Sequence, residues 1–60
     1  MSIHVAIVED NRSFRAKLVE YLNETPGYKC VGDCDSAEDA LKLIPRWQPE
    51  VVLMDIHLPN

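Results

Sequence analysis

The sequence predicts an α/β fold, a three-stranded parallel sheet in the order 2-1-3 with helices on both faces. Three apolar segments, 3–8, 28–34 and 51–54, are predicted to form strands, and they alternate with two segments whose apolar residues recur at helical spacing. Strands that alternate with helices through short connections run parallel and are joined by right-handed crossovers. Segment 3–8 is nearly continuous in apolar residues, as is typical of a strand covered on both faces, so it takes the centre.

The first helix is predicted to follow residue 11, because apolar residues recur every four positions at Phe14, Leu18 and Leu22. Arg15 is expected on the opposite, solvent-facing side of this helix. The helix is expected to stop at 25–27, Thr-Pro-Gly, since proline disfavours helix in the residue before it and glycine permits the turn. The strand that follows, 28–34, contains charged residues and therefore suits an edge of the sheet.

The second helix has a predicted start at Ser36, which with Asp39 forms a variant of the capping box. Apolar residues then follow at helical spacing: Ala37, Ala40, Leu41 and Ile44. Pro45 is expected to end or distort this helix, because proline lacks the backbone N–H that a helix interior needs. Trp47 is expected to cover the end of the helix.

Length and composition restrict the classes of protein. Sixty residues suit one small domain with a marginal core, and the net charge of -4 argues against direct binding of nucleic acid or an anionic membrane. No apolar run is long enough to cross a bilayer, and a cytoplasmic chain is expected. Cys30 and Cys34 lie about 13 Å apart on an extended strand, whereas disulfide-bonded Cα atoms approach to about 4.4–6.8 Å, so both are expected to be free, buried thiols.

Acidic residues end two of the predicted strands. Glu9 and Asp10 follow the first strand and Asp55 follows the third. The carboxyl ends of parallel strands meet at one edge of the sheet, where ligands bind, so these three side chains are expected at one site. At an effective dielectric of about 20, unit charges about 4 Å apart repel by roughly 4 kcal/mol, and full ionisation calls for a cation. A set of ligands that consists only of oxygen atoms points to Mg²⁺ as that cation.

Each acidic group also has a plainer interpretation. Glu9 and Asp10 could form a solvated turn, and Asp10 could cap the first helix through its side chain. Asp55 could be a turn residue before Pro59. The placement of all three at the point where the strand order reverses favours the functional interpretation.

Three segments resemble the receiver domains of two-component response regulators: Val-Glu-Asp at 8–10, Ser-Ala-Glu-Asp-Ala-Leu at 36–41 and Pro-Glu-Val-Val-Leu-Met-Asp-Ile-His-Leu-Pro at 49–59. The resemblance runs the whole length of the chain and covers the amino-terminal half of such a domain. It implies that 1–60 is a truncated receiver domain, strand-helix-strand-helix-strand, forming half of a flavodoxin-like, doubly wound fold.

The resemblance also implies a function. The residue matching Asp55 is the phosphoacceptor, which takes a phosphoryl group from a sensor histidine kinase. Residues matching Glu9, Asp10 and Asp55 hold Mg²⁺, to which the residue matching His57 contributes its backbone carbonyl. Receivers further use a Ser or Thr after a fourth strand and a Lys after a fifth to contact the phosphoryl group, and the chain contains neither position. The chain is therefore expected to be a signalling module and not an enzyme.

The parent protein is expected to control transcription, and the resemblance is strongest to receivers that precede a LuxR-type helix-turn-helix domain. DNA would then be bound only through that separate output domain. The chain itself is expected to form a homo-oligomer through its third strand. Two alternatives stay open, a self-associating interaction module that never carries phosphate and a metal-dependent aspartyl phosphohydrolase. The second fits less well, because such enzymes place Asp-x-Asp after the first strand, where this chain has Glu9, Asp10 and Asn11.

Overall fold

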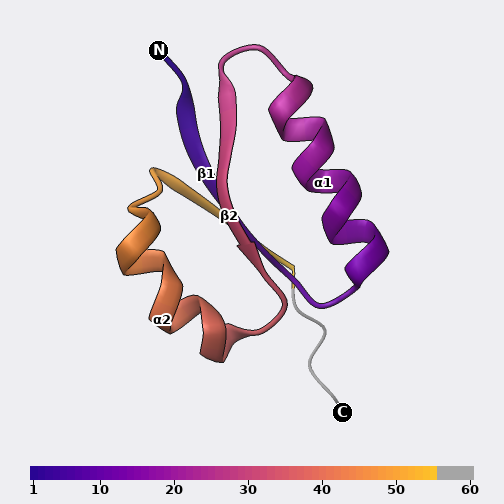
Figure 1. Cartoon of the computed structure of the whole chain (residues 1–60), viewed down its shortest axis with the longest axis vertical. Coiled ribbons are helices and arrows are strands. Elements are labelled where there is room, and N and C mark those ends of the chain that lie inside the picture. Colours follow the sequence, from indigo (N-terminus) through magenta and orange to yellow (C-terminus); the bar gives the residue numbers. More distant parts are fainter. Residues whose placement is uncertain (56–60) are drawn as a thin grey trace.

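The structure, a computed structural model, describes residues 1–55 of the chain. Five elements follow one another, and they are β1 (Ile3–Glu9), α1 (Arg12–Glu24), β2 (Tyr28–Cys34), α2 (Ala37–Trp47) and β3 (Val51–Asp55) (Figure 1). The three strands form a parallel sheet in the order β2-β1-β3. The predicted α/β class and strand order are confirmed, and β1 and β3 each run one residue further than predicted, through their terminal acidic residue.

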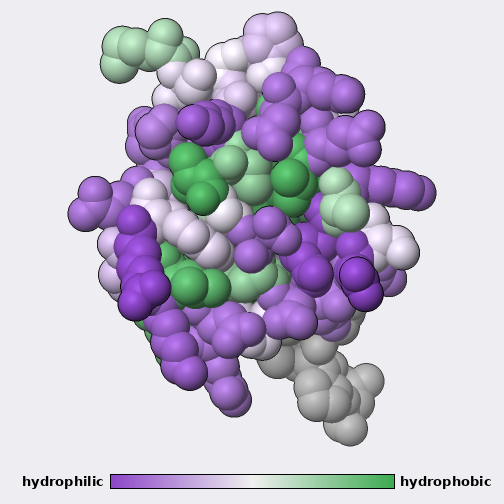
Figure 2. Space-filling view, in the orientation of Figure 1, coloured by the Kyte–Doolittle hydropathy of each residue, from purple (hydrophilic) through white to green (hydrophobic). Residues whose placement is uncertain are grey.

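β1 is the centre of the molecule. Residues 5–9 are buried, while α1 lies on one side of the sheet and α2 on the other (Figure 1). Burial on both faces explains why this strand is almost wholly apolar. Apolar residues gather between the two helices in this view, and hydrophilic residues cover their outer surfaces (Figure 2). No helix in residues 1–55 is long and apolar enough to span a membrane.

α1 begins at a cap that the sequence analysis did not identify. The Asn11 side chain accepts a hydrogen bond from the Phe14 backbone N–H at 2.9 Å, which satisfies one of the donors left free at a helix start. The alternative that Asp10 caps this helix is therefore wrong. The predicted end is confirmed, because Thr25 is the C-cap and Gly27 makes the turn with a φ of 90°, a conformation that costs glycine little.

α2 begins as predicted, since Ser36 Oγ accepts a hydrogen bond from the Asp39 N–H at 3.1 Å. Of the two outcomes predicted for Pro45, ending the helix is wrong, because α2 continues to Trp47. Proline removes the hydrogen bond that its own N–H would donate and crowds the carbonyl four residues earlier, but Pro45 lies only two residues before the end of α2. The next turn is closed by the Gln48 N–H, which donates to the Ile44 carbonyl at 2.9 Å, with Gln48 in the left-handed conformation at a φ of 49°.

The two edges of the sheet differ. β2 carries an irregularity at Val31, where the pairing with β1 shifts, and it brings Gly32 directly beneath the Trp47 ring. Bulges and charged residues protect an exposed edge from pairing with other strands. On the other side, every residue of β3 is exposed, and β3 contacts β1 but neither helix. Within residues 1–55, the outer edge of β3 has no strand beside it and its pairing with β1 has no irregularity.

Candidate functional site

The candidate site lies where β1 and β3 end. Glu9 and Asp55 occupy paired positions of these neighbouring strands, and Asp10 follows Glu9 directly. Neighbouring strands are about 4.8 Å apart, and residues paired in register project from the same face of the sheet. Glu9 is only 1% exposed, whereas Asp10 and Asp55 are both exposed. The structure thus places the three acidic residues predicted from sequence at one edge, one buried and two open to solvent.

Glu9 is the only charged residue among the buried residues of the described chain. One of its carboxylate oxygens, Oε2, accepts a hydrogen bond from the Asn11 backbone N–H at 2.8 Å. The other, Oε1, is buried and has no hydrogen-bond partner within residues 1–55. A buried carboxylate oxygen without a partner is energetically costly, and such groups occur preferentially at functional sites.

The surroundings of Glu9 raise its pKa above the ordinary value of 4.5. The hydrogen bond from the Asn11 backbone is the largest single influence and lowers the pKa. Desolvation, the contact with the Asp10 carboxyl group and the negative charges of Asp55 and Asp10 together outweigh that hydrogen bond. The negative charges of Asp10 and Asp55 thus act on Glu9, and a cation beside Glu9 would favour its ionised form.

The raised pKa of Glu9 predicts a dependence of stability on pH. The folded chain holds the Glu9 proton more tightly than the unfolded chain does, so this contribution is fully present below pH 4.5 and is lost as the pH rises through the raised pKa. In urea unfolding between pH 4 and 8, wild type should lose stability relative to Glu9→Gln as the pH increases. Glu20→Gln, on the exposed side of α1, is the control. A difference between wild type and Glu9→Gln that stays constant with pH would contradict the raised pKa of Glu9.

The donor set suits a hard cation, because it consists of carboxylate oxygens and one of them, Glu9 Oε1, has no hydrogen-bond partner among the described residues. Within residues 1–55, however, no three His, Cys, Asp or Glu side chains are grouped closely enough to form a ready-made metal site. Mutual repulsion between carboxylates opposes such a grouping. His57, the fourth predicted contributor, lies outside the described residues.

Arg15 belongs to this region, although the sequence analysis placed it on the solvent-facing side of α1. Its side chain is 17% exposed, and its Nη1 donates a hydrogen bond to the Glu9 backbone carbonyl at 2.9 Å. Its Nε pairs with Asp33 Oδ2 at 3.1 Å. Helical periodicity missed Arg15 because a long side chain can fold back along the helix to a strand end. The available signal was a cation on the first turns of the helix that follows an acidic strand end.

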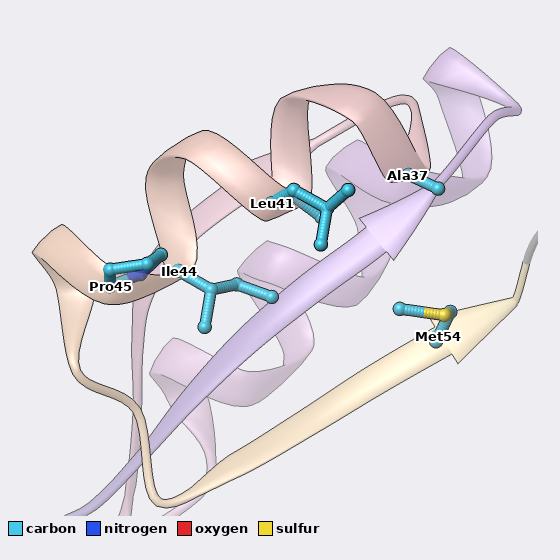
Figure 3. Close-up of a pocket in the computed structure, with 6 residues that line it drawn as sticks. Ala37, Leu41, Ile44, Pro45 and Met54 are labelled. Atoms are coloured by element: carbon cyan, nitrogen blue, oxygen red, sulfur yellow. The ribbon is translucent and has the colours of Figure 1, made fainter.

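An apolar groove lies beside the acidic edge, between α2 and β3. It has a volume of about 290 Å³, and residues from both elements line it: Ala37, Ala40, Leu41, Ile44, Pro45 and Met54. Leu41 and Ile44 extend from α2 toward the strand, and Met54 extends from β3 toward the helix without closing the gap (Figure 3). Met54 remains 59% exposed as a result. The groove offers apolar contact area but no acid, base or nucleophile.

Comparisons with known proteins agree with this architecture. Residues 5–60 match the family model described as response regulator receiver domain. An uncharacterised response regulatory protein of Yersinia pestis is 42% identical over 97% of the chain and 24% of its own length. The transcriptional regulatory protein DegU of Brevibacillus brevis is 33% identical over 97% of the chain and 25% of its own length.

A protein of a different kind is also similar. The protein-glutamate methylesterase/protein-glutamine glutaminase 2 of Photobacterium profundum is 32% identical over 98% of the chain and 15% of its own length. The chain thus spans about a quarter or less of these curated relatives. No solved structure matches it significantly. The family model covers almost the whole chain, and the chain therefore belongs to the receiver domains of response regulators.

Proposed function

We propose that Asp55 is the phosphoacceptor of this receiver domain and takes its phosphoryl group from a sensor histidine kinase. The observation that carries the proposal is the pairing of exposed Asp55 with buried Glu9 at the carboxyl edge of the sheet, beside Asp10. An acceptor must be reachable by a bulky donor, and Asp55 meets that requirement. Glu9 and Asp10 supply the negative field that a phosphoryl-transfer site balances with a cation.

Mg²⁺ is the proposed cofactor, held by Glu9, Asp10 and Asp55 together with the backbone carbonyl of His57. Two observations support this assignment: Glu9 Oε1 has no hydrogen-bond partner in the part of the chain that the structure describes, and the donors are all oxygen atoms. When bound, Mg²⁺ offsets the negative charge that accumulates as a phosphoryl group approaches a carboxylate. Contacts through water are included in the proposal, because Mg²⁺ gives up its hydration reluctantly.

The reaction proposed for Asp55 is a single in-line transfer. A carboxylate oxygen of Asp55 forms a bond to phosphorus while the P–N bond of the donor phosphohistidine breaks, and the imidazole leaves with the electron pair. The product is an acyl phosphate on Asp55. Glu9 and Asp10 position charge and take no part in bond making. The module accepts phosphate onto itself and is not proposed to turn over a separate substrate.

The output of the whole protein is proposed to be control of transcription, with DNA bound only through a separate domain of the LuxR helix-turn-helix type. Similarity to a transcriptional regulatory protein supports this choice. Similarity to a protein-glutamate methylesterase favours a second candidate, an enzymatic output domain governed by the same kind of receiver. The 60-residue chain is further proposed to form a homodimer through β3. This self-association would also be the function of the chain if it never carried phosphate.

Binding of a divalent cation tests the proposed site. In calorimetric titration with Mg²⁺ or Mn²⁺, the wild-type chain should bind weakly, and both Asp10→Asn and Asp55→Asn should abolish the signal, because each removes a charged ligand from a small set. Glu24→Gln, at the far end of α1, is the control and should bind as wild type does. Unchanged binding in the two aspartate variants would show that the shared site does not exist and would favour the pure interaction module.

The same preparations locate the phosphoacceptor. After brief exposure to phosphoramidate and Mg²⁺, borohydride reduction followed by mass spectrometry should place the acyl phosphate on Asp55 alone. The yield should be low and the label short-lived, because the Ser or Thr and the Lys with which receivers contact the phosphoryl group are not among residues 1–60. Groups that stabilise charge in phosphoryl transfer contribute orders of magnitude in rate. A label on another carboxylate, or one that persists in Asp55→Asn, would contradict the assignment.

A further inference from the structure

Arg15 connects three elements beside the acidic edge. From α1 its Nη1 donates to the backbone carbonyl of Glu9, the last residue of β1, at 2.9 Å. Its Nε pairs at 3.1 Å with the carboxylate of Asp33, the second-last residue of β2. The planar guanidinium presents several donors in a fixed geometry, so one side chain can hold two acceptors at once. Arg15 therefore braces the ends of two strands against the helix that follows the first of them.

We propose that Arg15 is a positioning residue, which fixes the Glu9–Asp10 peptide so that both carboxylates are presented toward the end of β3. Because the peptide group is planar, holding the Glu9 carbonyl oxygen also fixes the Asp10 nitrogen and Cα. The direction in which Asp10 leaves the strand is then set by α1. The inference rests on the proposed function, in which Glu9 and Asp10 hold a cation beside Asp55.

The two contacts of Arg15 contribute unequally. The hydrogen bond to the Glu9 carbonyl is partly buried, and a charged donor strengthens it. The Asp33 side chain is 42% exposed, so water and salt weaken the ion pair. Loss of Arg15 should therefore disturb the Glu9–Asp10 peptide strongly, whereas loss of the Asp33 charge should disturb it only slightly. A lysine at position 15 keeps the charge but reaches one acceptor at a time, so its effect should be intermediate.

Amide hydrogen exchange tests the positioning without any metal. The Asn11 N–H, which donates to Glu9 Oε2 at 2.8 Å, reports the Glu9–Asp10 turn. The Glu50 N–H, which donates to the His4 carbonyl at 2.9 Å, reports the opposite end of the sheet. Arg15→Met should accelerate exchange at Asn11 by about tenfold, as expected for loss of one charge-assisted hydrogen bond, and leave Glu50 unchanged.

The comparison variants separate positioning from general loosening. Arg, Met and Lys have similar helix propensities, so the variants at position 15 should not differ in how much α1 frays. Acceleration at Asn11 should be smaller in Arg15→Lys, smallest in Asp33→Asn and nil in Arg46→Lys, a control in the last turn of α2. An unchanged Asn11 rate, or equal acceleration at Asn11 and Glu50, would overturn the proposal. If Arg15→Met does not fold, Arg15→Lys decides the same question.

Binding of Mn²⁺, followed by electron paramagnetic resonance, tests whether the contacts of Arg15 affect cation binding at Glu9, Asp10 and Asp55. The dissociation constant should rise in the same order as the exchange rates, by about tenfold in Arg15→Met. Faster exchange at Asn11 with an unchanged dissociation constant would overturn the positioning role. Wild-type protein that binds no Mn²⁺ would contradict the proposed function instead, and the exchange rates would still decide whether Arg15 holds the turn.

Discussion

Gly32→Ala is expected to lower the free energy of unfolding by about 1–3 kcal/mol, a large fraction of what a core of this size supplies. A Cβ at position 32 would overlap with the Trp47 ring, which covers Gly32 where α2 meets β2. The ring would have to move, and it also packs against the core formed by Val8, Cys34 and Ala40. The loss should appear in urea unfolding followed by far-ultraviolet circular dichroism.

A double-mutant cycle isolates the overlap with Trp47. In a Trp47→Leu background the ring is gone, so adding Gly32→Ala should cost much less, or should stabilise slightly because alanine restricts the unfolded chain. Trp47→Leu alone accounts for the lost packing. If Gly32→Ala costs the same in both backgrounds, the contact with Trp47 is not what requires glycine at this position.

Dimerisation is the second large effect that we expect. All five residues of β3 are exposed, its pairing with β1 shows no irregularity and its only charged residue is Asp55 at the end, so a second copy can add its own β3 to the sheet. Antiparallel pairing of the two β3 strands would give a closed twofold dimer and would keep the two Asp55 side chains apart. Sedimentation equilibrium should show a monomer–dimer equilibrium that depends on concentration.

A charge on the free edge should weaken this association. Leu53→Lys places an ammonium group on β3 and should raise the dimer dissociation constant at least about tenfold, because lysine on an edge opposes strand pairing. Tyr21→Lys is the matched control, since Tyr21 is an exposed apolar residue on α1. A folded monomer at every concentration of wild-type protein would contradict the association.

The fold was predictable because its signals are local and repeated. Residues 3–8 are apolar except for His4, as is typical of a central strand, and helical spacing places the two helices between strands. The one-residue extension of β1 and β3 was not predictable, since hydrophobicity stops at Val8 and Met54 while the backbone pairing continues to Glu9 and Asp55. Patterns of hydrophobicity report burial of side chains and do not report backbone hydrogen bonds.

The acidic site was predictable in its location but not in its detail. Strand ends converge by topology, so Glu9, Asp10 and Asp55 had to share an edge. That Glu9 would be buried was not predictable, because charged side chains are usually exposed and the N–H that binds it comes from a backbone turn. The role of Arg15 was not predictable for a similar reason. Its acceptor at Glu9 is a backbone carbonyl, which every residue has and which leaves no pattern in the sequence.

The pairing shift at Val31 has a consequence for the two thiols. Cys30 pairs with Val5 and Cys34 with Val8, and these positions of β1 project from opposite faces of the sheet. Without the extra residue, thiols four positions apart would share one face. The sheet itself therefore stands between them, with Cys34 packed beneath α2. Both thiols are free, as predicted, but the expectation that both are buried is wrong for Cys30, which is only partly buried. A thiol-specific alkylating reagent should therefore label Cys30 in the folded chain and label Cys34 much more slowly, because the Cys34 thiol becomes accessible only when α2 moves away from the sheet.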